Sequence, residues 1–540
     1  MNTKQAEYRY SINTSADAIQ EEKMDYKLIR ENFTVKKTLF DGTVQQSVEL
    51  DYILPDYYPE IYKVLNLRIL PAVTKQSLNL TKLEYELSAK VRLVYVSESG
   101  EISAVEQVLS YGKTQELPVA AQSPGVCIQP YTESASCRVV NKRRVDVRGI
   151  ITIAVNVTSD DIRQAVSGAQ GGGIQLKKTL ITYPARRVAV TKRVTVVDDA
   201  ELGLSHPPLK TVIRADACIT SFDKKVLSGK LLTKGEAEVS LLYVPYVAEG
   251  SGEDATPQNI KFSVPFSQIS DVEGLDERYD LITDASVSSC EITPSTKGAN
   301  PAVSCELGIE IRCLAMRFES AELATDAFST VCEAALETDT ESIECIPVPI
   351  NETHRQKSSL TYYDGEIRAV IYAGAEVGRI AVQSLKNGDT VLSGRVTMYA
   401  YAQNETGMPV YLETTEEIEH KIARGSKEIC RSAQVNASVS AASFNLTSSN
   451  ALEISADIKL SGYLYEESEQ SFISGIILDD TKPIQTDKDV AIKLYYAQKD
   501  DQPWEIAKSC HASVSAIMEE NELEGERLTE PKMILIPIVD

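Results

Sequence analysis

The residues best suited to covalent or metal chemistry in this chain are its cysteines and histidines. Ten cysteines are spread over 540 residues, at Cys127, Cys137, Cys218, Cys290, Cys305, Cys313, Cys332, Cys345, Cys430 and Cys510. No two of them form a Cys-x-x-Cys pair, and His206, His354, His420 and His511 show no ligand spacing with them. The sequence therefore argues against a zinc site. Because several cysteines lie in alternating apolar strands, we expect buried free thiols in a reducing compartment.

Motifs for phosphate binding or nucleophilic catalysis are also lacking in the sequence. The glycine run Gly171–Gly173 is followed by Ile174, whereas a phosphate-binding loop ends in Gly-Lys-Ser/Thr. We therefore predict a flexible linker at this run. No serine lies in a Gly-x-Ser-x-Gly turn. The many acidic pairs fall in expected strands and turns, which is typical of solvated faces. We expect a protein that is not an enzyme, with no catalytic residues, cofactor or metal.

Charge and composition limit the class of partner. The net charge of −23 argues against nucleic acid and against anionic membrane surfaces. The polar start Met1–Glu7 lacks the apolar segment of a signal peptide, and no run reaches transmembrane length. We therefore expect a cytosolic chain without direct membrane insertion. The 25 tyrosines, against 9 phenylalanines, indicate either strand packing with surface hydroxyls or contact area for partners.

Most of the chain shows the two-residue periodicity of β-strands. Apolar residues occupy every second position from Leu83 to Tyr95, which is the pattern of a half-buried strand. The pattern returns 148 residues later, from Leu231 to Tyr243, and the preceding segments align at the same offset. Such agreement over many positions indicates an internal repeat. A weaker third copy includes residues 392–398.

The repeat predicts three β units of ordinary domain size, followed by a smaller module. We predict a flexible N-terminal segment at residues 1–25, β units at 26–172, 173–326 and 327–486, and a C-terminal module at 487–540. Each unit is expected to be an antiparallel sandwich or barrel. The predicted fold class is therefore mainly β.

The C-terminal module departs from this pattern and reads as strand, helix, helix, strand. A short apolar and aromatic strand begins at Ile492, and Pro503 suits the first turn of a helix. Asp501 is the expected N-cap of this helix, and Ser513 that of the next one. The only tryptophan, Trp504, either fills the small core or borders a binding face.

This module resembles a LysM domain, a βααβ family. The family motif has a basic residue, Gly-Asp-Thr-Leu-Trp and Ile-Ala after the first strand, then Asn and a final Leu-Ile-Pro. The residues that match are Lys499, Asp501, Trp504, Ile506, Ala507, Asn521, Leu535, Ile536 and Pro537. Asp500, Gln502 and Pro503 replace the family's Gly, Thr and Leu. In sugar-binding members this loop lies against the glycan, and a charged side chain at Asp500 hinders that approach.

We therefore expect the module to bind a protein. The candidate partner-binding residues are Lys499, Asp500, Asp501, Gln502, Trp504, Glu505, Ile506 and Lys508. Residues 487–540 carry twice as many acidic as basic side chains. A partner with basic and apolar groups suits such a surface better than a neutral sugar polymer does, and a short apolar anchor is enough for a specific contact.

The stretch Tyr52–Leu65, together with the strand that ends at Tyr95, resembles the SPOCS domain of spore-coat-associated proteins in endospore-forming Firmicutes. Three such units before a LysM domain resemble coat morphogenetic proteins that engage the ATPase SpoIVA. The resemblance implies a mother-cell adaptor at the forespore surface, in the basement layer of the coat. It implies LysM binding to a SpoIVA-type ATPase, with other coat proteins as further partners of the β units.

Two other classes of function are kept beside this hypothesis. The first is a peptidoglycan-binding protein anchored to cortex or wall through LysM, although the absent signal peptide and the altered loop argue against it. The second is a hydrolase with a LysM targeting module, for which the sequence offers no catalytic residues.

Overall fold

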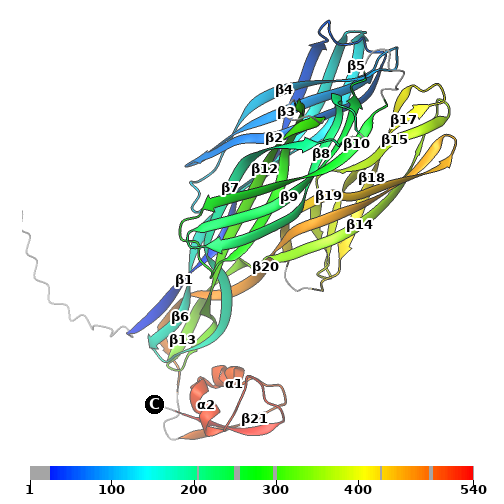
Figure 1. The fold of residues 1–540 in the computed structure, drawn as a ribbon. Helices are drawn as coiled ribbons and strands as arrows, with labels where there is room; N and C mark the ends of the chain where they lie inside the picture. The colour runs from blue at the N-terminus through cyan, green and yellow to red at the C-terminus, as the bar shows by residue number, and fades with distance from the viewer. Residues whose placement is uncertain are drawn as a thin grey trace, which may run out of the picture.

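The computed structural model describes residues 25–203, 206–247, 256–295, 301–425, 429–485 and 490–538. Within these ranges the chain has 22 strands and two helices, so the predicted mainly β class is confirmed. Both helices lie in the C-terminal module (Figure 1). No helix in the described ranges is long and apolar enough to cross a membrane. The predicted N-terminal segment lies outside the described residues apart from Asp25, and so does the predicted boundary at 486/487.

The first six strands, which we call unit 1, form two three-stranded antiparallel sheets. The sheet orders are β1-β6-β5 and β2-β3-β4. The strands are β1 (Tyr26–Ile53), β2 (Lys63–Asn79), β3 (Lys82–Val96), β4 (Ile102–Glu116), β5 (Gly125–Asn141) and β6 (Arg144–Gly171).

The next six strands, unit 2, repeat this arrangement. Their sheet orders are β11-β12-β7 and β10-β9-β8. The strands are β7 (Ile174–Glu201), β8 (Leu209–Leu227), β9 (Lys230–Pro245), β10 (Gln258–Asp271), β11 (Asp280–Ser295) and β12 (Ala302–Ser329).

The last eight strands before the C-terminal module, unit 3, form two four-stranded sheets. One contains β13-β20-β14 with β19 paired to β20, and the other β15-β17-β16 with β18 paired to β17. The strands are β13 (Cys332–Glu344), β14 (Val348–Thr361), β15 (Ile367–Val377), β16 (Ala381–Ser384), β17 (Thr390–Asn404), β18 (Pro409–Ile422), β19 (Ile429–Ser448) and β20 (Ala451–Pro483).

The alternating apolar positions form the core between the two sheets of each unit. In β3 all seven alternating residues from Leu83 to Tyr95 are buried. Tyr95 donates its hydroxyl to the backbone oxygen of Pro59 at 2.9 Å, and Tyr243 donates in the same way to Pro207 at 2.9 Å. Because both donors and both acceptors are 148 residues apart in the sequence, the sequence offset corresponds to a repeated side-chain contact.

The central strands are buried on their second face as well, because the three units pack against one another. Val94 and Val96 of β3 lie in one apolar cluster with Leu242 of β9 and with Tyr399 and Tyr401 of β17. Alternation in sequence predicts one buried face, so this second face was not expected. The three units are therefore joined through a shared core rather than strung on linkers.

A cluster of charged residues lies beside this shared core. Arg68 Nη1 is 3.2 Å from Asp216 Oδ1, and Arg68 Nη2 is 3.0 Å from Glu376 Oε1. Arg214, only 4% exposed, pairs with Asp216 and with Glu376 at 2.9 Å. Its guanidinium carbon also lies 4.0 Å from the ring centre of Tyr399, a cation–π contact. Each of the three units contributes to this cluster, which we call the axial cluster.

The axial cluster is ionised at neutral pH. Burial raises the pKa of Asp216, but Arg214 and Arg68 outweigh this effect and lower it from 3.8 to about 2. A lowered carboxylate pKa means that its stabilising effect is present above pH 3.8 and is lost as the pH falls toward 2.

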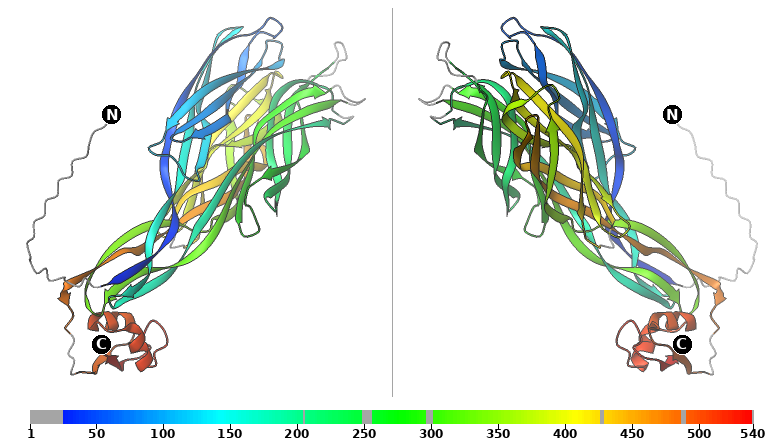
Figure 2. Two further views of the ribbon diagram at one scale, coloured as in Figure 1. Left: turned by 90° about the vertical axis from the view of Figure 1, so that its left-hand side faces the viewer. Right: turned by 90° about the vertical axis from the view of Figure 1, so that its right-hand side faces the viewer.

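Beyond the sandwiches, three pairs of long strands continue as a narrow stalk. The pairs are β1 with β6, β7 with β12, and β13 with β20. Figure 2 shows them converging toward the C-terminal module. Phe33 of unit 1, Tyr183 of unit 2 and Phe472 of unit 3 are buried together there. Three two-stranded ribbons thus bury one another's apolar faces, which a single ribbon cannot do alone.

A second set of ion pairs ties the units where the stalk meets the sandwiches. Arg187 of unit 2 pairs with Asp160 of unit 1 and Glu344 of unit 3. Lys36 of unit 1 also reaches Glu344, at 2.7 Å. Burial raises the pKa of Glu344, but Lys36 and Arg187 outweigh it and the pKa is lowered. Glu344 therefore stays charged at neutral pH and links all three units.

The glycine run is a tight turn at the stalk end, not the flexible linker predicted from sequence. Gly172 and Gly173 have φ of +62° and +60° between β6 and β7. Positive φ at two successive residues is the geometry of turns in which glycine is favoured. Thr330 donates its backbone N–H to the Gly173 oxygen at 3.0 Å, so this turn is held against the passage from β12 to β13.

We expect Gly173→Ala to lower the free energy of unfolding by about 2–3 kcal/mol, from strain at positive φ plus steric overlap. A Cβ there would lie 2.3 Å from Thr330 Oγ1 and 2.7 Å from Val331 Cγ2. Gly229→Ala is the matched control, because Gly229 has φ of +70° but open space around its Cβ position. It should cost only about 1 kcal/mol. Equal losses for the two variants in denaturant unfolding would contradict close packing at the turn.

Candidate protein-interaction site

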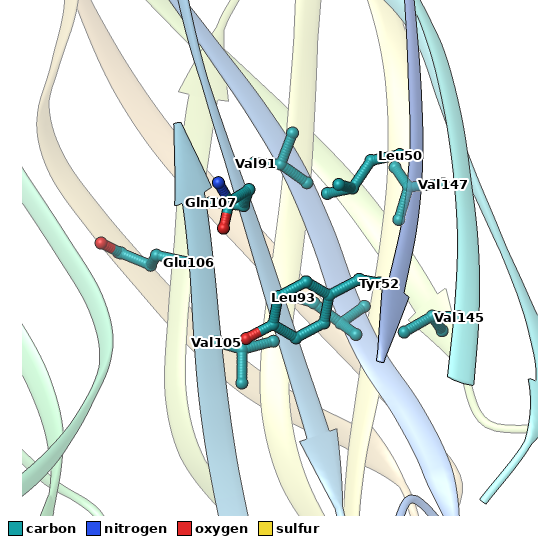
Figure 3. Close-up of a pocket in the computed structure, with 9 residues that line it drawn as sticks. All are labelled: Leu50, Tyr52, Val91, Leu93, Val105, Glu106, Gln107, Val145 and Val147. Atoms are coloured by element: carbon teal, nitrogen blue, oxygen red, sulfur yellow. The ribbon is translucent and has the colours of Figure 1, made fainter. Parts of the chain in front are cut away.

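Unit 1 contains a small apolar gap between its two sheets (Figure 3). It is lined by Leu50, Tyr52, Val91, Leu93, Val105, Glu106, Gln107, Val145 and Val147. Its volume is about 10 Å³, room for a single water molecule. Glu106 points away from the apolar side chains and pairs with Arg92. This gap is too small to admit a substrate.

The described ranges contain no cluster of metal-binding side chains. No group of three or more His, Cys, Asp or Glu residues there is placed to hold a metal ion. Cys305, Cys313, Cys332 and Cys430 are free thiols and are buried. Burial raises the pKa of Cys313 to about 11. This thiol is therefore protonated, and unreactive, at neutral pH.

The C-terminal module contains β21 (Ile492–Ala497), α1 (Pro503–Cys510), α2 (Val514–Glu520) and β22 (Lys532–Pro537). Pro503 occupies the first turn of α1 as predicted, but the N-cap is Gln502, without a side-chain hydrogen bond. The predicted cap at Asp501 is wrong, because its carboxylate accepts the backbone N–H of Gln498 at 2.7 Å and shapes the preceding loop. The predicted cap at Ser513 is confirmed, since its hydroxyl accepts the N–H of Ala516.

A small core holds the two helices on one face of the β21–β22 sheet. Its buried members in the module are Ala497, Trp504, Ile506, Ala507, Ala512, Ile517, Leu528, Ile534 and Ile536. Asn521 fastens α2 to β22. Its side chain accepts the N–H of Leu535 at 2.7 Å and donates to the Leu535 oxygen at 2.6 Å. An amide side chain can do both at once, which explains why asparagine suits this buried position.

In the loop before α1, a charged residue adopts the left-handed backbone conformation that glycine usually adopts. Asp500 has φ of +71° and is exposed. Its N–H donates to the Leu528 oxygen at 2.9 Å, and Leu528 returns a bond to the Asp501 oxygen at 2.9 Å. Left-handed backbone is tolerated by aspartate better than by most residues. The loop is thus ordered, and the Asp500 carboxylate lies at its surface.

The eight predicted partner-binding residues differ in accessibility. Lys499, Asp500 and Glu505 are exposed, Asp501, Gln502 and Lys508 are half-buried, and Trp504 and Ile506 are buried. Ile506 belongs to the core of the module. The structure thus separates the eight residues into exposed, half-buried and buried groups. Their role in partner binding stays a prediction.

Gln502, Trp504 and Lys508 turn toward the end of the stalk instead of toward solvent. Trp504 Nε1 donates to Asp326 Oδ2 at 2.8 Å, and Lys508 Nζ lies 2.7 Å from both Asp326 oxygens. The Phe328 ring meets the Trp504 ring edge-on, with centroids 5.1 Å apart. We call Lys177, Asp326, Phe328 and Ser329 the stalk tip.

Two weaker contacts complete this surface. Lys177 Nζ donates to Gln502 Oε1 at 3.0 Å, and His511 Nδ1 lies 3.3 Å from the Ser329 oxygen. Burial raises the pKa of Asp326, but hydrogen bonds from Lys508 and Trp504 outweigh it and the pKa is lowered. The carboxylate is therefore charged at neutral pH and pairs with Lys508.

Sequence reasoning did not identify the stalk tip. In the sequence, Asp326 is only the last residue of a predicted β unit, and Phe328 carries no signal. Asp326 and Lys508 are 182 residues apart, so no local spacing relates them. The useful clue is an acidic and an aromatic residue closing a long strand, but a single sequence does not say what they contact.

The outer face of the β21–β22 sheet is apolar and exposed. Ile492, Leu494 and Tyr496 alternate along β21, and they are paired with Pro537, Leu535 and Met533 of β22. Leu494 is 67% exposed, Tyr496 59% and Met533 50%. The opposite face carries the buried Ile534 and Ile536. A two-stranded sheet with a core on one side and large apolar residues in water on the other has the character of an interaction surface.

The fold and this surface define a chain of packed antiparallel β-sandwiches that presents a small exposed module at the end of a stalk. The family model described as SipL, SPOCS domain matches residues 208–294, from β8 to β11. This match relates the chain to SipL-like proteins of sporulation. No curated protein and no solved structure matches the chain.

Proposed function

We propose that this chain is a non-enzymatic adaptor in endospore coat assembly that binds a SpoIVA-type morphogenetic ATPase through its C-terminal, LysM-like module. The SPOCS match at residues 208–294 supports the sporulation setting. The observation that carries the binding role is the exposed apolar face formed by Ile492, Leu494, Tyr496 and Met533. We further propose that residues 26–172, 173–326 and 327–486 are three SPOCS units, which offer surfaces to other coat proteins.

The outer face has the composition of a protein-binding anchor. Tyrosine is among the residues that carry most of the free energy of protein association when a partner covers them. The neighbouring aliphatic side chains of this face add apolar area for the partner to bury. The exposed loop residues Lys499 and Asp500, which follow β21, supply charged groups of both signs next to this anchor. Such a rim favours a protein that offers apolar groups together with charges of both signs.

The alternative function is peptidoglycan binding, which the strand-helix-helix-strand order of the module favours. The loop argues against it, because Asp500 places a carboxylate where sugar-binding LysM domains bring backbone close to the glycan. The two functions differ in an observable way. A glycan-binding protein sediments with purified peptidoglycan, whereas the proposed adaptor stays in solution.

The proposed role at the forespore surface can be tested in sporulating cells. We expect a fluorescent fusion of the full chain to surround the forespore on its mother-cell side, and to become diffuse when the SpoIVA-type ATPase is removed. Affinity purification of the tagged chain from such cells should recover that ATPase. Normal placement around the forespore without the ATPase would contradict the proposed tether.

A further inference from the structure

We propose that the stalk tip gates the C-terminal module: while Asp326 and Phe328 hold α1, the face with Trp504 and Lys508 is closed to a partner. Releasing the contact between the stalk tip and α1 makes this face accessible to the partner. The inference rests on the adaptor function proposed above and adds a regulation of the same module. Three of the eight residues expected at the partner interface, Gln502, Trp504 and Lys508, are engaged by the stalk tip.

The contact has the chemistry of a specific latch. Both oxygens of Asp326 are used: Oδ1 accepts from Lys508 and from the backbone N–H of Ala327, and Oδ2 accepts from Lys508 and from the indole N–H of Trp504. Hydrogen bonds between charged groups are shorter and stronger than neutral ones. Phe328 adds an aromatic contact and is itself buried against the module core. The arrangement fixes one orientation of α1 on the stalk.

The same contact is suited to release. The side chains of Lys508 and Asp326 keep 39% and 24% of their surface accessible. Water can therefore replace each hydrogen bond, so its net contribution is modest. Phe328 is the one stalk residue in the apolar cluster of the module within the described ranges. A partner that binds Trp504 or Lys508 must therefore displace the carboxylate of Asp326 and the ring of Phe328.

With α1 docked on the stalk tip, one face of the module is accessible to a partner and another is covered. The outer face of β21–β22 is exposed while α1 is held. A partner can thus touch Leu494 and Tyr496 first, and it reaches Trp504 only after the stalk is displaced. When a binding-competent state is only partly populated, the apparent affinity falls by that fraction. Removing the latch from the stalk side should therefore strengthen partner binding without altering the module.

The test uses the full chain with Asp326→Ala and a matched control. Glu322→Ala removes an exposed carboxylate four residues earlier on the same strand. Trp504 is the only tryptophan, so its fluorescence reports on the latch alone. We expect Asp326→Ala to raise the acrylamide quenching constant roughly twofold, because the indole loses its cover. Affinity for the purified SpoIVA-type ATPase should rise about fivefold to tenfold. Asp326→Asn, which keeps one acceptor for the indole, should give an intermediate effect.

Hydrogen exchange at Ile534 and Ile536 in β22 separates release from unfolding of the module. Their protection must remain, since both residues lie in the module core. Unchanged quenching in Asp326→Ala would overturn the latch. Higher quenching with unchanged affinity for the ATPase would show that the contact only positions α1 on the stalk. That result would overturn the proposed gate and leave the adaptor function standing. If neither wild type nor variant binds the ATPase, the proposed function fails and the gate fails with it.

Discussion

Replacing Leu494 and Tyr496 together by aspartate is expected to weaken binding of the SpoIVA-type ATPase at least about 100-fold. Truncating a residue that anchors an interface costs about 2 kcal/mol or more, and each 1.4 kcal/mol is a factor of ten. Both side chains lie on the exposed outer face, and their loss leaves the module core intact. Titration of the variant against the purified ATPase measures the effect.

The matched control for this double variant introduces the same charges elsewhere. Ile162→Asp with Leu180→Asp changes two side chains on the stalk that are similarly exposed, at 60% and 65%. This control should bind the ATPase as the unmodified chain does. Comparable loss in both double variants would mean that added negative charge, and not the outer face, governs binding.

Arg214→Met is expected to cause the largest loss of stability, about 3 kcal/mol in the free energy of unfolding. Removing one partner of a buried ion pair costs roughly 3–5 kcal/mol, because the other charge is left uncompensated. We expect the lower end of that range. Asp216 keeps 39% of its side-chain surface accessible, and Arg68 still pairs with both carboxylates. The loss should appear as one cooperative unfolding transition with its midpoint at a lower denaturant concentration, because the axial cluster joins all three units.

Arg144→Met is the control for this prediction. Arg144 also pairs with an aspartate, Asp51, but both groups lie at the surface. Exposed ion pairs are screened by water, so little change in unfolding is expected. Similar destabilisation by the two substitutions would contradict the view that the axial cluster, more than surface pairing, holds the units together.

The strands were predictable because their pattern is local. Alternation from Leu83 to Tyr95 identified the face of β3 that is buried in unit 1. The same local reading missed the second buried face at Val94 and Val96, because their neighbours Leu242 and Tyr399 come from other units. Long-range packing between repeats leaves no periodic trace in one strand.

Turn and cap chemistry was only partly readable. Ser513 caps α2 as expected, since its hydroxyl reaches an N–H three residues ahead. The glycine run predicts a linker, but glycine permits both flexible segments and left-handed turns. Its surroundings decide between the two, and they come from Thr330 and Leu478, far along the chain. The division into domains stays a prediction.

The candidate site was likewise predictable only in part from the sequence. Sequence similarity directed attention to the loop and helix from Lys499 to Lys508. The apolar outer face, by contrast, follows from the pairing of β21 with β22, which places Leu494 beside Leu535. The covering of Trp504 by Asp326 depends on a contact across 178 residues. A residue type can suggest an interaction, but only the fold identifies the surface that is free to make it.

The most direct test of the adaptor function compares the full chain with a chain ending at residue 485. Each is titrated against purified SpoIVA-type ATPase, and each is mixed with purified peptidoglycan and sedimented. We predict saturable ATPase binding by the full chain, none by the shortened chain, and no sedimentation of either. ATPase binding that survives removal of the module would contradict the account. So would a full chain that sediments with peptidoglycan and ignores the ATPase.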